Sequence, residues 1–389
     1  MNRVAAFTVF AIVIVVTAGF LVTFNFGGDE KKPTSMPSCY IGVAFCGNTT
    51  AEGKLLVDKV KSYTNLFIVD SIVVNKNETA LNEICNYAVS EGLYVMVYFG
   101  DFNLPWQLGW VNDTKQQLGN WFLGVYYYDE PGGIQLDYNW SNSTTGLVPN
   151  LANTTRDYDK AAATYISNFQ NYPNFKALKK CPVTVFTSDY ALYWFDYEAG
   201  FDVVLSQFGW NMSTAQNIDL IRGAAQMANK TWGAIVTWKY DDPPYLDTAE
   251  EIYNQLLLAY ESGAKYLTVF NYPTYPENNP YGLLTEQHFD ALQLLWNTVM
   301  NSSQSASNME YSQAQAALVL PRNYGSGLRN PTDRIWGFWG PDENSAQVLN
   351  ITRTLVWMYG TRIDIVYDAP AFHVPHRYQT VYYWNQTVY

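Results

Sequence analysis

The chain has 389 residues, of which 48% are apolar and 16% aromatic, and its formal net charge at pH 7 is −12. This length suits two to three domains, although one large barrel domain alone can take about 250 residues, and the apolar content is enough for a sizeable core. The negative charge argues against nucleic acid or an anionic membrane surface as the partner, because both are themselves negative.

The first segment of the chain is an apolar run, residues 4–24, with no charged residue between Arg3 and Asp29. A helix of this length spans a hydrocarbon core of about 30 Å. We therefore predict a single-pass membrane anchor over residues 1–27, followed by a polar linker over 28–37. The alternative is a cleaved signal peptide, which would leave a secreted protein.

Asn-x-Ser/Thr sequons follow the apolar run in large number and predict a glycosylated chain outside the cell. They lie at Asn48, Asn77, Asn112, Asn139, Asn142, Asn153, Asn211, Asn229, Asn301, Asn350 and Asn385. In that compartment the four cysteines are able to form up to two disulfides, in any of three full pairings. The cysteines and the three histidines lack the spacing of a metal site, so we predict no metal, and no motif predicts a cofactor.

Eight short runs rich in β-branched and aromatic residues come next, and segments of helical period separate most of them. The runs are 40–46, 66–71, 94–101, 122–130, 183–189, 202–208, 234–241 and 266–272, and the clearest helices are 79–91, 248–262 and 285–300. A capping box of Thr248 and Glu251 opens the second of these helices. Alternation of strand and helix predicts a parallel sheet, and eight repeats predict closure into a (β/α)8 TIM barrel over 38–300. An open doubly wound sheet is the alternative, but the chain has no Gly-rich phosphate loop.

A second, smaller unit follows the barrel after a polar linker over 301–313. Strand patterns at 316–321, 362–367 and 380–384 and a helical pattern at 345–359 predict a partial flavodoxin-like, parallel α/β domain over 314–389. About 75 residues form a small core for independent stability. We therefore expect this domain to dock on the barrel or on a second copy of the chain, as a homo-oligomer.

Polar side chains stand at the ends of most predicted strands, where barrels of this kind carry their functional residues. The candidate catalytic residues are Asp101, Asp129, Glu130, Asp189 and Asp241, and the candidate substrate-binding residues are Asp70, Tyr126, Tyr128, Gln207, Trp238 and Lys239. Carboxylates in such a ring suit sugar chemistry, because they bind hydroxyl groups and transfer protons. The competing interpretation is structural, with the acids acting as loop caps and the rings filling the barrel.

Strand alternation separates the two acids of the fourth strand. Side chains alternate between the two faces of a strand. Val125 belongs on the outer face, against the helices, and Asp129 shares that face. Glu130 then points into the barrel mouth together with Tyr126 and Tyr128.

The sequence Asp129-Glu130-Pro131 at the end of this strand resembles a large clan of barrel glycoside hydrolases. In that clan an Asn-Glu-Pro at this position supplies the general acid/base, and a Glu ending strand seven is the nucleophile. The resemblance implies that Glu130 is the acid/base, with Asp129 in place of Asn. Strand seven offers Lys239 and Asp241 but no Glu, so a retaining mechanism lacks its nucleophile and an inverting one remains open. A barrel followed by an α/β layer also resembles β-galactosidase-type enzymes that carry an amidotransferase-like domain.

Two functions follow from these patterns. The first is a cell-surface, glycoside-hydrolase-like enzyme acting on extracellular glycans, in which Glu130 protonates the glycosidic oxygen. Asp101, Asp189 or Asp241 would then be the nucleophile or base. The second is a non-catalytic glycan-binding or structural envelope protein with a degenerate barrel site.

Overall fold

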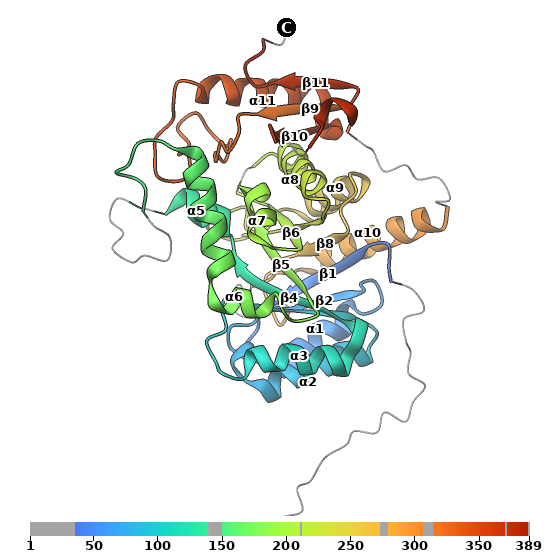
Figure 1. The fold of residues 1–389 in the computed structure, drawn as a ribbon. Coiled ribbons are helices and arrows are strands. Elements are labelled where there is room, and N and C mark those ends of the chain that lie inside the picture. Colours follow the sequence, from blue (N-terminus) through green and yellow to red (C-terminus); the bar gives the residue numbers. More distant parts are fainter. Residues whose placement is uncertain are drawn as a thin grey trace, which may run out of the picture. The chain divides into compact units, whose positions relative to one another are not determined.

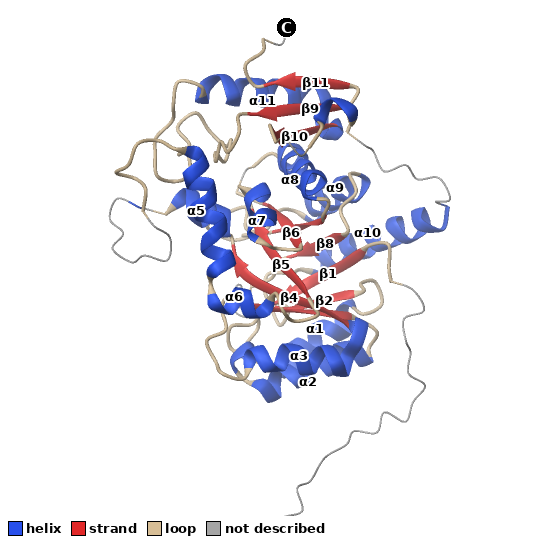
Figure 2. Cartoon of the chain, viewed as in Figure 1, coloured by secondary structure: helices blue, strands red, loops and turns tan. Residues whose placement is uncertain are grey.

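Eight parallel strands close into a barrel, in which each strand pairs with the next and β1 pairs with β8 (Figures 1 and 2). They are β1 (Tyr40–Phe45), β2 (Leu66–Val69), β3 (Tyr94–Phe99), β4 (Phe122–Asp129), β5 (Thr184–Asp189), β6 (Val203–Phe208), β7 (Thr231–Val236) and β8 (Tyr266–Val269). This computed structural model describes residues 36–138, 140, 150–210, 212–272, 279–305, 314–369 and 372–387. The predicted (β/α)8 barrel is confirmed.

Helices connect successive strands along the chain (Figure 2). They are α1 (Thr50–Val60), α2 (Glu78–Ser90), α3 (Gln107–Leu118), α4 (Pro131–Asp137), α5 (Tyr158–Asn171), α6 (Pro173–Leu178), α7 (Tyr193–Ala199), α8 (Thr214–Ala228), α9 (Ala249–Glu261) and α10 (Glu286–Ser305). The predicted capping box of Thr248 and Glu251 opens α9, and Thr49 and Glu52 open α1 in the same way. A cap of this kind stabilises a helix by about 1 kcal/mol.

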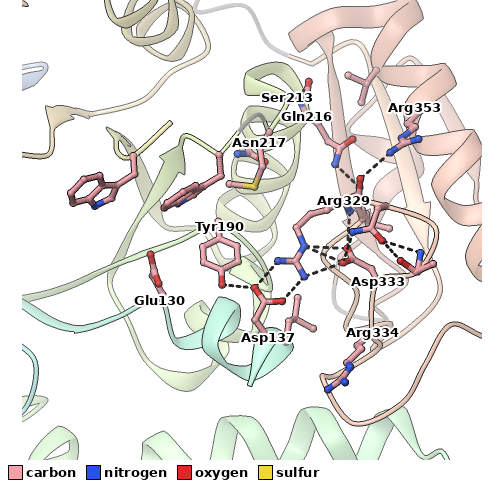
Figure 3. A pocket seen from close by; sticks show the side chains of 18 of the residues that line it. Glu130, Asp137, Tyr190, Ser213, Gln216, Asn217, Arg329, Asp333, Arg334 and Arg353 are labelled. Atoms are coloured by element: carbon pink, nitrogen blue, oxygen red, sulfur yellow. Dashed lines mark hydrogen bonds and ion pairs between the residues drawn. The ribbon is translucent and has the colours of Figure 1, made fainter. Parts of the chain in front are cut away.

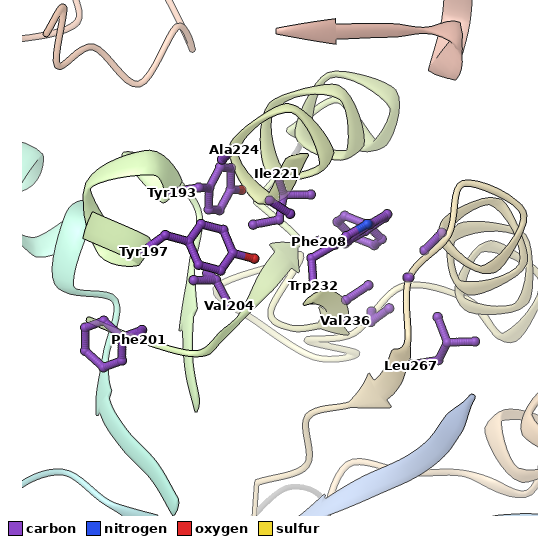
Figure 4. Close-up of a cluster of buried hydrophobic side chains, with 14 of the residues drawn as sticks. Tyr193, Tyr197, Phe201, Val204, Phe208, Ile221, Ala224, Trp232, Val236 and Leu267 are labelled. Carbon is purple, nitrogen blue, oxygen red and sulfur yellow. The ribbon is translucent and has the colours of Figure 1, made fainter. Parts of the chain in front are cut away.

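Apolar side chains fill two separate regions, the inside of the barrel and the layer between the barrel and its helices. Alternation along each strand divides them, as on β6, where Leu205 packs inside while Val204 and Phe208 pack outside. Figure 4 shows part of the outer layer, in which α7 and α8 cover β6 and β7 through Tyr193, Tyr197, Ile221, Ala224, Trp232 and Val236. The inside is therefore a packed core, and the space for a ligand lies at the barrel mouth.

Strand β4 contains an extra residue near its end, which changes the direction of its last side chains. Between Tyr126 and Asp129, three steps along β4 match two steps along β5. Tyr128 accommodates the extra residue with a φ of 57°, and its ring packs outside against Phe169 of α5. Asp129 turns inward, where it accepts hydrogen bonds from the hydroxyls of Tyr126 and Ser188. The predicted alternation, with Tyr128 inside and Asp129 outside, is therefore wrong beyond this bulge.

Strand seven lies earlier in the chain than predicted, over Thr231–Val236 instead of 234–241. Beyond β7 the backbone N–H of Lys239 donates to the carbonyl of Tyr245, within the same loop, and no longer to a neighbouring strand. Asp241 consequently lies exposed on a loop and not at the end of a strand.

The C-terminal part forms a parallel sheet of three strands, in the order β10-β9-β11. Its elements are β9 (Ala316–Leu320), α11 (Ser345–Tyr359), β10 (Ile363–Tyr367) and β11 (Thr380–Tyr383). These bounds agree with the predicted strands and helix to within one residue at each end. The small parallel α/β layer that the sequence predicts is thus present.

This layer packs on helix α8 of the barrel. The Arg222 Nε donates to Asp364 Oδ1 at 2.6 Å, and both side chains are buried. Gly223 allows β10 to come close, since a Cβ at that position would lie 2.1 Å from the carbonyl oxygen of Ile365. Residues from Pro37 onward form one compact unit. Docking on the barrel, one of the two expected arrangements, is therefore what the structure shows.

Two further expectations concern the cysteines and the membrane. All four cysteines lie among the described residues and all are free, so none of the possible disulfides is formed in the structure. Cys39 and Cys85 are buried in the outer apolar layer. In the described part of the chain, every helix is too short or too polar to cross a membrane. The predicted anchor over residues 4–24 lies outside the described residues.

Candidate functional site

A cleft of about 1370 Å³ lies at the barrel mouth, between the ends of the strands and the C-terminal layer (Figure 3). The barrel contributes α4, the residues that follow β5, β6 and β7, and the first turn of α8. The C-terminal layer contributes the segment 328–334 and one face of α11. The polar lining comprises Glu130, Asp137, Tyr190, Ser213, Gln216, Asn217, Arg329, Asn330, Thr332, Asp333, Arg334 and Arg353.

Glu130 lies at the barrel side of this cleft, directly before the first residue of α4. Its φ of 53° and ψ of 45° place it in the left-handed region, where a non-glycine residue is strained. Burial raises the pKa of its carboxyl to about 7, and the charge of Asp129 adds to the rise. A hydrogen bond from Gln207 works in the opposite direction. Glu130 is therefore a strained, partly buried acid that exchanges its proton near neutral pH.

Asp189 holds the turn that carries Glu130. It is fully buried, and its carboxylate accepts hydrogen bonds from the backbone N–H groups of Gly132 and Gly133 in α4. Two more N–H groups, of Tyr190 and Ala191, donate to the same side chain. Asp189 does not line the cleft. It acts on the site by fixing the start of α4, and the cleft offers it no contact with a substrate.

Asp129 and Asp70 lie close together at the ends of β4 and β2. Burial raises the pKa of both carboxyls, and the charge of Asp129 raises that of Asp70 further. The thiol of Cys46 is hydrogen-bonded to Asp70. Tyr126 is almost fully buried beside Asp129, so it fills the barrel and does not face the cleft. Of the acids at the strand ends, only Glu130 lines the cleft itself.

Gln207 connects this acidic group to the cleft. Its Nε2 donates to Ser188 Oγ at 2.7 Å, and Ser188 in turn donates to Asp129. Its Oε1 is buried and has no hydrogen-bond partner among the described residues. Because Gln207 is also hydrogen-bonded to Glu130, this free acceptor lies beside the candidate acid. Gln207 is buried and does not line the cleft, so it acts on the site through Glu130 and not by contact with a ligand in the cleft.

Asp101 lies outside the cleft, on the outer side of β4. Its carboxylate accepts hydrogen bonds from the hydroxyls of Tyr127 and Tyr172 and from the amide of Asn174. Burial raises the pKa of Asp101, but these hydrogen bonds outweigh it and the net shift is downward. Asp101 therefore connects β3 to the segment around α6. The catalytic role that the sequence suggested for it does not fit this position outside the cleft.

Two candidates of the β7 segment also lie elsewhere. Lys239 Nζ pairs with Asp247 Oδ1 at 2.8 Å and does not approach Glu130. Asp241 is exposed on the same loop, outside the residues that line the cleft. Trp238, in contrast, does line the cleft, and its ring packs edge to face on Tyr245. Because β7 ends at Val236, Lys239 and Asp241 lie farther along the loop that follows it, and only Trp238 of these three candidates lines the cleft.

The most extensive ion-pair network of the cleft consists of residues that the sequence did not single out. Arg329 of the C-terminal layer donates two hydrogen bonds of 2.8 Å to the carboxylate of Asp137 in α4. It also pairs with Asp333 at 3.0 Å, and Tyr190 donates to Asp137 at 2.7 Å. Burial raises the pKa of Asp137, but Arg329 and Tyr190 more than offset this and hold it below its usual value. Asp137 therefore stays ionised.

No family model matches this sequence, and no curated protein matches it. Among solved structures, it is similar to α-L-fucosidase isoenzyme 2 from Paenibacillus thiaminolyticus, with a TM-score of 0.50 and 11% identity. That match covers 84% of this chain and 58% of the fucosidase chain. It is also similar to a 3-keto-L-gulonate-6-phosphate decarboxylase from Vibrio cholerae, with a TM-score of 0.37 and 10% identity over 67% of this chain and 99% of that one.

An orotidine 5′-monophosphate decarboxylase from Methanocaldococcus jannaschii matches at a TM-score of 0.35 and 9% identity, over 67% of this chain and 98% of that one. These neighbours catalyse different reactions, as is common for this fold. The closed barrel of eight parallel strands gives the chain the fold of the TIM-barrel enzymes, and a glycoside hydrolase is one of the solved structures to which it is similar.

Proposed function

We propose that this chain is a glycoside-hydrolase-like enzyme that acts on glycans in the cleft, with Glu130 as the general acid. One observation carries the proposal: Glu130 is a cleft-lining carboxyl at the barrel mouth whose pKa is raised to about 7. A carboxyl with this pKa keeps its proton up to neutral pH and can give it to a glycosidic oxygen.

Asp137 is the candidate for the second carboxylate. It lies seven residues after Glu130, which is two turns of helix or a rise of about 10 Å. Arg329 and Tyr190 keep it ionised, while burial keeps Glu130 protonated. Opposite pKa shifts of this kind separate an acid from a base. We propose an inverting reaction on this basis, because a backbone separation of this order allows a water molecule to lie between the two carboxyl groups.

The exposure of the sequons supports an extracytoplasmic, glycosylated chain. Among the described residues, Asn48, Asn77, Asn153, Asn229, Asn301, Asn350 and Asn385 are exposed, and Asn112 is half-buried. Together with the apolar run over residues 4–24, these exposures support our proposal that the chain acts on glycans outside the cell and is held at the membrane.

The test is hydrolysis of a panel of aryl glycosides and polysaccharides by the full chain and by Glu130→Gln. Without its acid, the enzyme should lose about 10²–10⁴-fold in rate on natural glycans. It should lose much less on aryl glycosides whose leaving groups need no proton. Glu261→Gln, an exposed glutamate on α9, is the matched control and should behave as wild type. Hydrolysis that is equally fast in Glu130→Gln on every substrate would overturn the assignment.

The second candidate function is a glycan-binding protein without turnover. It is favoured by the contacts of Asp137, because both of its oxygens already accept hydrogen bonds from Arg329. A carboxylate engaged in this way is poorly placed to activate water. Binding on a glycan array without hydrolysis, unchanged by Asp137→Asn, would support this candidate over the enzyme.

A further inference from the structure

The end of the cleft opposite Glu130 is rich in arginine, although the chain as a whole has a net charge of −12. Figure 3 shows Arg334 and Arg353 on the side of the C-terminal layer, away from Glu130. The two carboxylates nearby, Asp137 and Asp333, are both paired with Arg329. Three arginines, Arg329, Arg334 and Arg353, thus face these two carboxylates, which leaves one net positive charge at this end of the cleft, although the charge of Asp137 also acts on Arg334.

Both of these arginines have donors to offer. Arg353 gives one hydrogen bond of 2.9 Å, from Nη2 to the carbonyl of Arg329, which fixes its direction. A guanidinium has five N–H donors, so four remain. Within the described ranges, Arg334 forms neither an ion pair nor a hydrogen bond, and both side chains are exposed. An arginine fork of this kind matches the geometry of a carboxylate or a sulfate.

Two exposed tryptophans accompany the arginines. Trp357 is 86% exposed, and it follows Arg353 by four residues on α11, so both lie on one face of the helix. Trp210 is 44% exposed and lines the barrel side of the same cleft. Exposed apolar side chains that gather around a cleft can mark a ligand-binding surface. An indole ring beside a guanidinium group suits a ligand that has an apolar face and an anionic group at its edge.

We propose that this end of the cleft binds an acidic sugar unit, a uronate or a sulfated sugar. Arg334 and Arg353 would bind its anionic group, and Trp357 would pack on the apolar face of its ring. The inference rests on the proposed function, in which the same glycan continues along the cleft to Glu130. It names the substrate class as acidic glycans, which the barrel mouth alone would not select.

The experiment measures binding of the full chain to three oligosaccharides of equal length: a polyuronate, a sulfated galactan and a neutral glucan. The variants are Arg334→Gln with Arg353→Gln, Trp357→Ala, and Arg322→Gln as a control arginine outside the cleft. The double arginine variant should bind the acidic oligosaccharides about 10-fold more weakly, with no change for the neutral one. Trp357→Ala should weaken binding of the acidic oligosaccharides, and Arg322→Gln should have no effect. Added salt should weaken only the binding that depends on the arginines.

The polyuronate and the sulfated galactan distinguish the two sources of charge. Polyglutamate and single-stranded DNA test whether charge alone is enough, and binding of either as tight as that of the acidic glycans would overturn the proposal. So would acidic binding that is unchanged in the double variant. Arginine-dependent binding of acidic glycans without hydrolysis would contradict the proposed enzyme activity and support the acidic-sugar site. Hydrolysis of neutral glycans that requires Glu130 but neither arginine would support the enzyme activity and contradict the acidic-sugar site.

Discussion

The pKa of Glu130 predicts a specific pH dependence of stability, which holds whether or not the protein is an enzyme. In the folded chain this carboxyl has a pKa of about 7, against an ordinary value of 4.5. A group that binds its proton more tightly when folded stabilises the fold while it is protonated. That contribution is fully present below pH 4.5 and is lost as the pH rises through 7. Glu130→Gln should remove this loss, because glutamine does not titrate.

The magnitude follows from the shift. About 2.5 pKa units correspond to about 3.4 kcal/mol as an upper limit. Solvent reaches part of the Glu130 side chain and screens its charge, so we expect about 1–2 kcal/mol. Relative to wild type, Glu130→Gln should therefore gain about this much stability between pH 4.5 and pH 8.

Urea unfolding followed by tryptophan fluorescence, at several pH values over this range, measures the difference. Glu261→Gln is again the control, since an exposed carboxyl should give no such trend. The buried acids Asp70 and Asp129 also titrate, but they are present in both chains, so the difference between the chains reports Glu130 together with its coupling to neighbouring acids such as Asp129. If wild type and Glu130→Gln lost stability in parallel between pH 5 and 8, the reasoning about Glu130 would be refuted.

Three other predictions concern the support of the site, the docking of the C-terminal layer and the sequons. Asp189→Asn should destabilise the fold by about 2–3 kcal/mol, measured by urea unfolding, because an amide cannot accept every backbone N–H bound there; an unchanged midpoint would contradict this. Gly223→Ala should cost about 1–3 kcal/mol by its clash with β10, whereas Gly109→Ala, exposed in the first turn of α3 where a Cβ meets no other atom, should gain up to about 1 kcal/mol. Equal midpoints would contradict the close packing. After secretory expression, glycopeptide mass spectrometry should find glycan on Asn153 but not on half-buried Asn112, and the reverse pattern would count against the exposures.

Most of the barrel could be predicted from the sequence, because its strands and helices depend on local patterns. The apolar runs of β1 to β6 and the capping box at Thr248 act over a few residues, and each was located to within about two residues. The C-terminal layer was predictable for the same reason. Glu130 was also found in this way, since its place follows from the end of β4 and from the family resemblance.

The rest of the site depended on tertiary structure. The bulge that turns Asp129 inward reflects how β4 pairs with β5, and alternation within one strand cannot reveal it. Asp189 resembled a catalytic residue in sequence, but the return of α4 to its carboxylate makes it a support. Arg329 and Asp137 are 192 residues apart and meet only because the C-terminal layer docks on α8. Local periodicity therefore determined the barrel and its acid, whereas the charge and shape of the cleft arise from contacts between segments that are distant in the chain.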